Sequence, residues 1–413
     1  MTRRRLLLIG AVLVAAACVE RTTAPGSCPE FCPSGRIAIV DTVLTNEVSR
    51  DTSFRGYVSS LQSTLLLAAD LPGFVDSRPV FRVNGVGARR SISTTDTSTG
   101  PILGADSARL QIVVSRRDTA AHNLTLRLFR LPKTTDSTTT FADLTGPFTD
   151  SLVRTLNIDT LLAQTGHKDT VTGDSVVVDS VSHTLVLSIK LDTAQARYIP
   201  DDSGSVAYGV RVSADSRASI ALARANLSLH WWLRVDSVGV PVPRTLPVLG
   251  AAFANFVFDP PAPPLDSTLA VGGVPSSRAV LRVAFPRFIR DSSQVIRGTL
   301  VFIPSGPVGG APSDSLVMEA RTVLADFGAK SPFDARLSDT TVVHTGVSDT
   351  VAIEVTNLLQ LWAADSTHPT TLVLRARDEA QSFAEARFYP SIATAFRPTL
   401  RITFVRRFPF GQP

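Results

Sequence analysis

The chain has 413 residues, of which 44% are hydrophobic and 19% are charged. This composition is far from that of disordered chains, and the length is sufficient for two domains with their own cores. The formal net charge of +5 falls to +2 without residues 1–17, which contain three arginines and no acid. So small a charge gives no support to nucleic-acid binding, which needs clustered cations.

The N-terminus has the pattern of an export signal. Arg3–Arg5 form a positive segment, Leu6–Val14 an apolar one, and three alanines then precede Cys18. This resembles the lipobox of bacterial lipoproteins, which implies removal of residues 1–17 and lipidation of Cys18. An ordinary signal peptide with a coincidental cysteine and an uncleaved anchor helix are the alternatives. The resemblance implies an extracytoplasmic protein attached to the bacterial membrane by its lipid, and Val19 favours the outer membrane or cell surface.

Two further cysteines follow Cys18 within the expected tether, residues 18–43. Cys28 and Cys32 form an even pair, which in an oxidising compartment indicates a disulfide that closes a small loop. A metal or redox site is the alternative, but the cysteines are separated by three residues and no histidine or second cysteine pair accompanies them.

Beyond the tether, apolar and polar residues alternate, as in segments 108–115, 124–130 and 184–192, and turn-forming residues separate these segments. The pattern predicts an all-β fold of two tandem antiparallel β-sandwiches, which follow the signal peptide and tether. The expected divisions are a first sandwich, a proline-rich linker, a second sandwich and a tail, at residues 44–240, 241–268, 269–406 and 407–413.

An internal repeat supports two related domains. The segment Ser77–Val83, SRPVFRV, recurs 200 positions later as Ser277–Val283, SRAVLRV. Each copy follows a turn and opens an alternating segment, which favours two similar sandwiches in tandem.

The second half resembles the DNRLRE domains of bacterial surface proteins. The resemblance depends on the order of several segments: 278–286, 295–302, 351–362, 371–374, 383–388 and 396–404. It implies a jelly-roll sandwich similar to carbohydrate-binding modules over about residues 270–405. The first half resembles this family only through its copy of the repeat.

Three tryptophans are the weak candidates for ligand binding. Trp231 and Trp232 are adjacent in an alternating segment, so one should point inward and the other outward. Trp362 fits a core position most simply, with stacking on a sugar ring as the alternative. We predict no catalytic residue, metal site or cofactor. The histidines lack metal-ligand spacing, and Asp201, Asp202 and the pair Glu379 and Glu385 could form a hydrolase site only if the fold joined them.

These patterns predict a non-catalytic, lipid-anchored cell-envelope protein. The family resemblance implies carbohydrate binding, with polysaccharide as the partner. A structural role, with an envelope or matrix protein as the partner, is the alternative, and a glycan-active hydrolase is a third class. The sequence leaves the ligand, calcium binding and the oligomeric state open.

Overall fold

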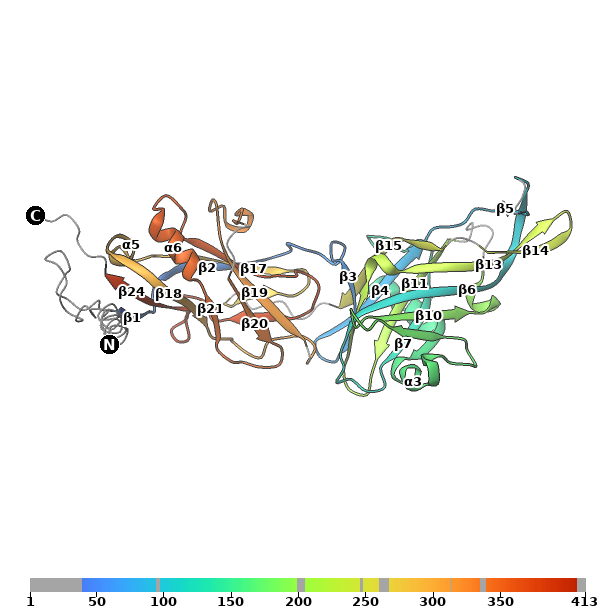
Figure 1. Cartoon of the computed structure of the whole chain (residues 1–413), viewed down its shortest axis with the longest axis horizontal. Coiled ribbons are helices and arrows are strands. Elements are labelled where there is room, and N and C mark those ends of the chain that lie inside the picture. Colours follow the sequence, from blue (N-terminus) through green and yellow to red (C-terminus); the bar gives the residue numbers. More distant parts are fainter. Residues whose placement is uncertain are drawn as a thin grey trace, which may run out of the picture. The chain divides into compact units, whose positions relative to one another are not determined.

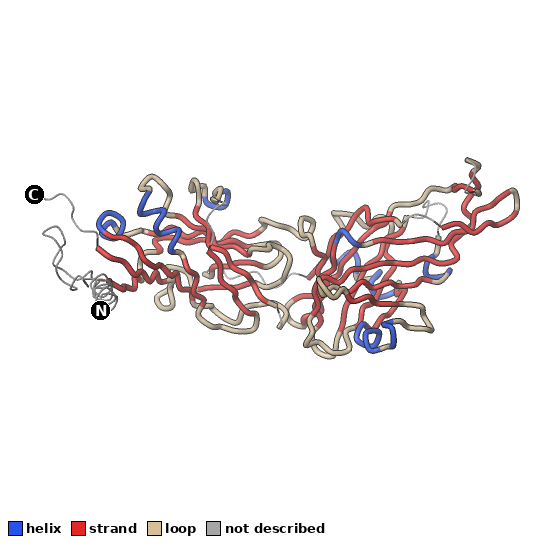
Figure 2. Tube along the Cα trace, viewed as in Figure 1, coloured by secondary structure: helices blue, strands red, loops and turns tan. Residues whose placement is uncertain are grey.

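The computed structural model describes residues 39–93, 97–198, 205–245, 248–259, 267–312, 314–334 and 339–406 (Figures 1 and 2). The predicted signal segment, the lipidated Cys18 and the predicted Cys28–Cys32 disulfide lie outside these ranges. Asp201 and Asp202 do as well. Within the described residues, no helix is long and apolar enough to cross a membrane.

The all-β prediction is confirmed, because 52% of the described residues are in strands and 12% in helices. Figure 2 shows that strands make up most of the trace. The alternating segments quoted above form strands β6 (Thr99–Arg117), β7 (Thr125–Leu131) and β10 (Leu185–Leu191). In β10, residues at every second position are buried, as expected for a strand with one face toward a core.

A sheet of 13 strands lies between residues 65 and 259. Its remaining strands are β3 (Leu65–Leu71), β4 (Val75–Val83), β5 (Arg89–Ser91), β8 (Leu152–Asn157), β9 (Ser175–Val178), β11 (Val206–Ser213), β12 (Ala218–Ala223), β13 (Ser228–Ser237), β14 (Val240–Thr245) and β15 (Leu249–Asp259). In the described part of this region, the strands are joined by short α-helices, α2 (Pro147–Asp150), α3 (Ile158–Ala163) and α4 (Thr193–Ala196), and by 3-10 turns.

The pairings of this sheet return to their starting strand. The sequence β13-β15-β4-β3-β12-β6 is closed by pairing of β6 with β13. Strand β11 branches from β4 and carries β7 and β8 beside it. The ring surrounds the larger hydrophobic core, which contains Phe81, Tyr208 and Trp231. We call this part of the chain the ring domain.

The other strands form two sheets that face a second core. One sheet contains β1 (Ile39–Leu44), β24 (Thr399–Arg406), β18 (Ser293–Phe302) and β21 (Val351–Glu354). The other contains β2 (Val48–Arg55), β16 (Leu269–Gly272), β17 (Ser277–Val283), β19 (Ser315–Thr322), β20 (Asp339–His344), β22 (Thr371–Ala376) and β23 (Glu385–Phe388). Helices α5 (Arg287–Ser292) and α6 (Thr356–Ala364) accompany them. We call this unit the split sandwich.

The strand pairing differs from the predicted division in two places. Strand β2 pairs with β17 along its length, and β1 is the neighbour of β24, so residues 39–55 belong to the split sandwich and not to the first domain or the tether. Strands β14 and β15 pair with β13 and β4, so residues 240–259 belong to the ring domain and not to a linker. The ring domain is thus an insertion between β2 and β16.

The repeated segments fall on β4 and β17, one in each domain. Segments 278–286, 295–302, 351–362, 371–374, 383–388 and 396–404 fall on strands and one helix of the split sandwich. They correspond to β17, β18, β21 followed by α6, β22, β23 and β24. The secondary structure of this region therefore agrees with the predicted order.

Candidate ligand-binding pocket

Two of the three predicted tryptophans are core residues. Trp231 is fully buried in the ring domain, where its ring meets that of Tyr198 edge to face at 6.4 Å between centroids. Trp362 is buried in the split sandwich, and its indole nitrogen donates a hydrogen bond to Thr322 Oγ1 at 3.1 Å. The core position expected for Trp362 and the inward position expected for one of the adjacent pair are therefore confirmed, and the sugar-stacking alternative for Trp362 is wrong, because its ring is buried.

Trp232 points away from the core that encloses Trp231, as the alternation predicted. Its side chain is half-buried, and the ring of His230 lies 4.3 Å away between centroids, at an interplanar angle of 31°. His230 and Trp232 are two positions apart and therefore lie on the same face of β13. The histidine ring covers part of the only predicted aromatic platform that reaches solvent.

The predicted acidic pair is engaged in ion pairs. Glu379 contacts Arg278 at 2.7 Å and Arg375 at 3.4 Å. Glu385 is bound by Arg387 at 2.7 Å and by Arg55. Both side chains are buried, so these contacts stabilise the split sandwich and leave neither carboxylate exposed for catalysis. Among the described residues, no group of three or more histidine, cysteine or acidic side chains could hold a metal ion.

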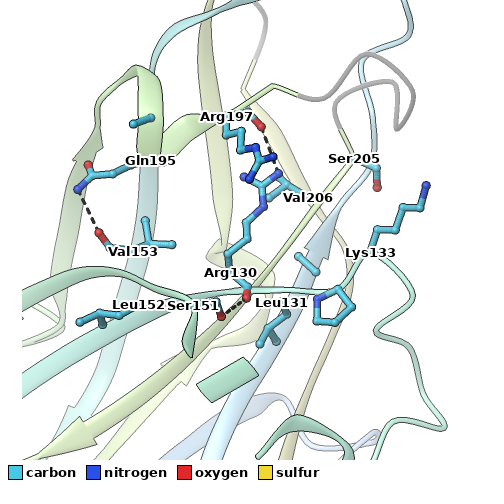
Figure 3. A pocket seen from close by; sticks show the side chains of 13 residues that line it. Arg130, Leu131, Lys133, Ser151, Leu152, Val153, Gln195, Arg197, Ser205 and Val206 are labelled. Atoms are coloured by element: carbon cyan, nitrogen blue, oxygen red, sulfur yellow. Dashed lines mark hydrogen bonds between the residues drawn. The ribbon is translucent and has the colours of Figure 1, made fainter. Parts of the chain in front are cut away.

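A pocket of about 540 Å³ lies instead in the ring domain, where β7, β8, α4 and the start of β11 meet (Figure 3). Pairing of β11 with β7 places Ala207 opposite Leu131, and pairing of β7 with β8 places Phe129 opposite Leu152. The lining consists of Arg130, Leu131, Pro132, Lys133, Ser151, Leu152, Val153, Ala194, Gln195, Arg197, Ser205, Val206 and Ala207.

Helix α4 is fixed in place by a reciprocal cap. The carboxylate of Asp192 accepts a hydrogen bond from the Gln195 backbone nitrogen at 2.9 Å, and the Gln195 side-chain oxygen accepts one from the Asp192 nitrogen at 3.1 Å. The Gln195 side-chain nitrogen also donates to the Val153 carbonyl at 3.0 Å. One glutamine therefore closes the cap and joins the helix to β8 (Figure 3).

Arg130 joins β7, on the opposite wall of the pocket, to the end of α4. Its guanidinium donates to the carbonyl oxygens of Ala196 at 3.1 Å and Arg197 at 3.3 Å, and Figure 3 shows its side chain rising across the pocket. Its own carbonyl accepts a hydrogen bond from the Ser151 hydroxyl at 2.5 Å. The pocket walls are thus held together by hydrogen bonds between segments that are distant in the sequence.

The described lining of the pocket contains three basic side chains. Arg130, Lys133 and Arg197 contribute to its lining, and none of the described lining residues is acidic. The guanidinium carbon of Arg130 lies 5.7 Å from the ring centroid of Tyr208, which is fully buried. Burial raises the pKa of Tyr208 to about 12, so its phenol stays neutral at physiological pH and does not offset the charge of Arg130.

Sequence reasoning missed this pocket. Its described lining comes from four separate parts of the chain, 130–133, 151–153, 194–197 and 205–207, and the residue types are ordinary for strands and turns. The Asp192-to-Gln195 spacing was the one local signal, since it is typical of a helix cap. That spacing predicts a short helix but no ligand.

No protein-family model matches the sequence, and no curated protein matches it. Among solved structures, the tandem CBM22-1-CBM22-2 domain of Xyn10C from Paenibacillus barcinonensis aligns with 90% of this chain and 99% of its own, at 9% identity and a TM-score of 0.15. A structure named BspA_C_WT aligns with 84% of this chain and 88% of its own, at 9% identity and a TM-score of 0.14. TM-scores this low do not establish a shared fold.

Proposed function

We propose that this chain is a non-catalytic, lipid-anchored envelope protein that binds a carbohydrate in the pocket of the ring domain. The lining of that pocket is the observation that supports binding. Apolar side chains, including Leu131, Pro132 and Leu152, lie beside the polar groups of Arg197 and Ser205. A sugar presents both C–H surfaces and hydroxyl groups, so it needs this mixture of contacts.

The size of the pocket agrees with a small portion of a glycan. Its volume of about 540 Å³ falls within the range of roughly 300–1,000 Å³ that is usual for small-molecule sites. The hydrogen bonds that join its walls also favour binding, because a preformed site loses less conformational entropy when a ligand enters.

Ala194 offers a direct test of this site because it is exposed and lines the pocket. Replacement with tryptophan, Ala194→Trp, would fill the pocket without disturbing the core. We expect calorimetric titration of the exported chain with a panel of neutral and acidic oligosaccharides to detect at least one ligand. Its affinity should fall at least tenfold in Ala194→Trp.

Ala352→Trp is the matched control, since Ala352 is an exposed alanine on β21 of the split sandwich. This variant should bind as the unchanged protein does. Equal binding by the Ala194→Trp variant would rule out the pocket as the site, and lack of binding to the whole panel would contradict carbohydrate binding.

The N-terminal segment supports the anchoring part of the proposal through the position of Cys18 after three alanines. In the Cys18→Ser variant, expressed in a bacterium with lipoprotein-processing enzymes, we expect loss of labelled-palmitate incorporation and transfer of the protein from the membrane to the soluble fraction. A single acyl chain anchors only weakly, so multiple acylation at one cysteine would account for stable attachment. Unchanged labelling and fractionation would exclude Cys18 as the lipid site.

A further inference from the structure

The two arginines of the pocket differ in how their guanidinium groups are engaged. Arg130 donates to two backbone carbonyls and faces no carboxylate among the described residues. Its positive charge is therefore hydrogen-bonded but not neutralised by those contacts. Arg197 is exposed at the pocket wall, and the structure shows no ion pair between its side chain and another described residue.

The backbone of Arg197 is strained. Its φ is 29° and its ψ is 79°, and positive φ is unfavourable for a residue with a side chain. Such strain is unfavourable and persists only where surrounding contacts impose it. Here the contacts are identifiable: the Arg197 nitrogen donates to the Thr193 carbonyl at 3.1 Å, and Arg130 holds the carbonyls of Ala196 and Arg197.

The same contacts thus tie one arginine of the pocket to the backbone of the other. Arg130 fixes the end of α4 in the conformation that places Arg197 at the pocket wall. A strained backbone at a ligand pocket is typical of a functional position, since an unstrained residue would give greater stability there. The strain is a separate observation from the charge, and both concern the same residue.

We infer that the ligand is an acidic saccharide, whose carboxylate or sulfate group is bound by Arg197. The positive charge of Arg130 adds electrostatic attraction for the same group. This inference rests on the proposed carbohydrate binding and specifies its chemical class. A guanidinium matches both oxyanions because it presents two parallel N–H donors. The apolar residues of the pocket then contact the sugar ring that carries the charged group.

The test compares an acidic saccharide with its uncharged ester and with a saccharide that carries sulfate in place of carboxylate. Calorimetric titration of the exported chain would use trigalacturonate, its methyl ester and a sulfated disaccharide, each at low and high salt. We expect an acidic probe to bind at least tenfold more tightly than the ester, with an affinity that falls as salt rises. The probe that binds more tightly, carboxylated or sulfated, identifies the group that the pocket prefers.

Three variants test whether the charge of Arg197 binds the acidic probe. Arg197→Gln should raise the Kd of the acidic probe about tenfold, because a charge-assisted hydrogen bond is lost. Arg197→Lys retains the charge and should recover part of that affinity. Arg127→Gln removes the same charge from an exposed position of β7 outside the pocket and should change the Kd less than about twofold.

The outcomes separate this inference from the function on which it rests. Equal affinity for trigalacturonate and its ester, or unchanged binding in Arg197→Gln, would overturn the acidic-ligand assignment but leave carbohydrate binding in place. Absence of binding to neutral and acidic saccharides alike would overturn the proposed function itself.

Discussion

A fragment of residues 267–413 should not fold, whereas the same fragment should fold when residues 39–59 are joined to it. The linear order of the chain favours the first fragment as an independent domain, but the pairing shows that it lacks β1 and β2. Strand β2 pairs with β17 from Ser277 to Val283. Removal of both strands would expose the edges of β17 and β24 and remove Val48 from the core.

The joined protein contains β1 and β2 and therefore restores these contacts, although it lacks the ring domain. A linker between residues 59 and 267 needs a modest length, since the Ser53 hydroxyl lies 3.4 Å from the Thr268 carbonyl. The six residues from 53 to 59 span at most about 20 Å, and a flexible linker of about 12 residues covers that distance. Strands β1 and β2 precede the ring domain in the sequence but belong to the split sandwich. An insertion therefore accounts for the topology better than two domains in tandem.

Circular dichroism, size-exclusion chromatography and thermal unfolding would measure the difference. We expect a cooperative transition and a monomer for the joined protein, and no cooperative transition or an aggregate for residues 267–413. A separate fragment of residues 60–259 should unfold cooperatively, because it retains all strands of the ring. A monomeric 267–413 fragment with the same Tm as the joined protein would show that β1 and β2 are dispensable.

The sequence predicted the strands much better than their partners. The alternation in segments 108–115 and 184–192 arises from burial of one strand face, which is a local property and can be read directly. The sheet to which residues 39–55 belong depends on pairing across more than 200 positions, and many other strands offer similar apolar faces. Neither composition nor turn residues specify such a pairing, so the domain boundaries were misplaced at both ends of the ring domain.

The tryptophans and the pocket show the same limit. Alternation predicted that one of Trp231 and Trp232 faces inward, but it did not predict that His230 packs on the outward one. The pocket depends on Gln195 and Arg130 bonding to backbone atoms of other segments. Every residue has a backbone carbonyl, so the residue types of the accepting segments do not reveal these hydrogen bonds.

Substitution of Glu319 should lower the free energy of unfolding more than most single substitutions in the split sandwich. Its buried carboxylate lies between three arginines: it contacts Arg321 at 3.0 Å, Arg375 at 3.2 Å and Arg377 at 3.3 Å. Phe333 covers the cluster, with its ring centroid 5.6 Å from the Arg321 guanidinium and 5.3 Å from that of Arg375. Removal of the Glu319 charge would take away the carboxylate that all three arginines contact, although Arg375 would keep its second contact, with Glu379 at 3.4 Å.

We expect Glu319→Gln to lower the free energy of unfolding by about 3 kcal/mol, since a neutral amide replaces the buried carboxylate of an ion-pair cluster. Chemical denaturation at pH 7 would measure this. Asp41→Asn is the control, because Asp41 pairs with Arg401 on an exposed part of β1, where loss of the pair should lower the free energy of unfolding much less than the change at Glu319 does. A loss for Glu319→Gln no larger than that of the control would show that the arginines do not need this carboxylate.

The pH dependence of stability provides a second test of the same cluster. Burial raises the pKa of Glu319, but hydrogen bonds and charges of the surrounding arginines together lower it by more. The pKa of Glu319 therefore lies below the ordinary value of 4.5. A carboxyl with a lowered folded-state pKa stabilises the protein above its unfolded-state pKa, and that contribution is lost as the pH falls through the folded-state value. The unchanged protein should therefore lose stability below about pH 4.5, and Glu319→Gln should lose less over the same interval. Parallel pH profiles for the two proteins would mean that Glu319 does not contribute to acid sensitivity, because the glutamine variant has no carboxyl at that position to protonate.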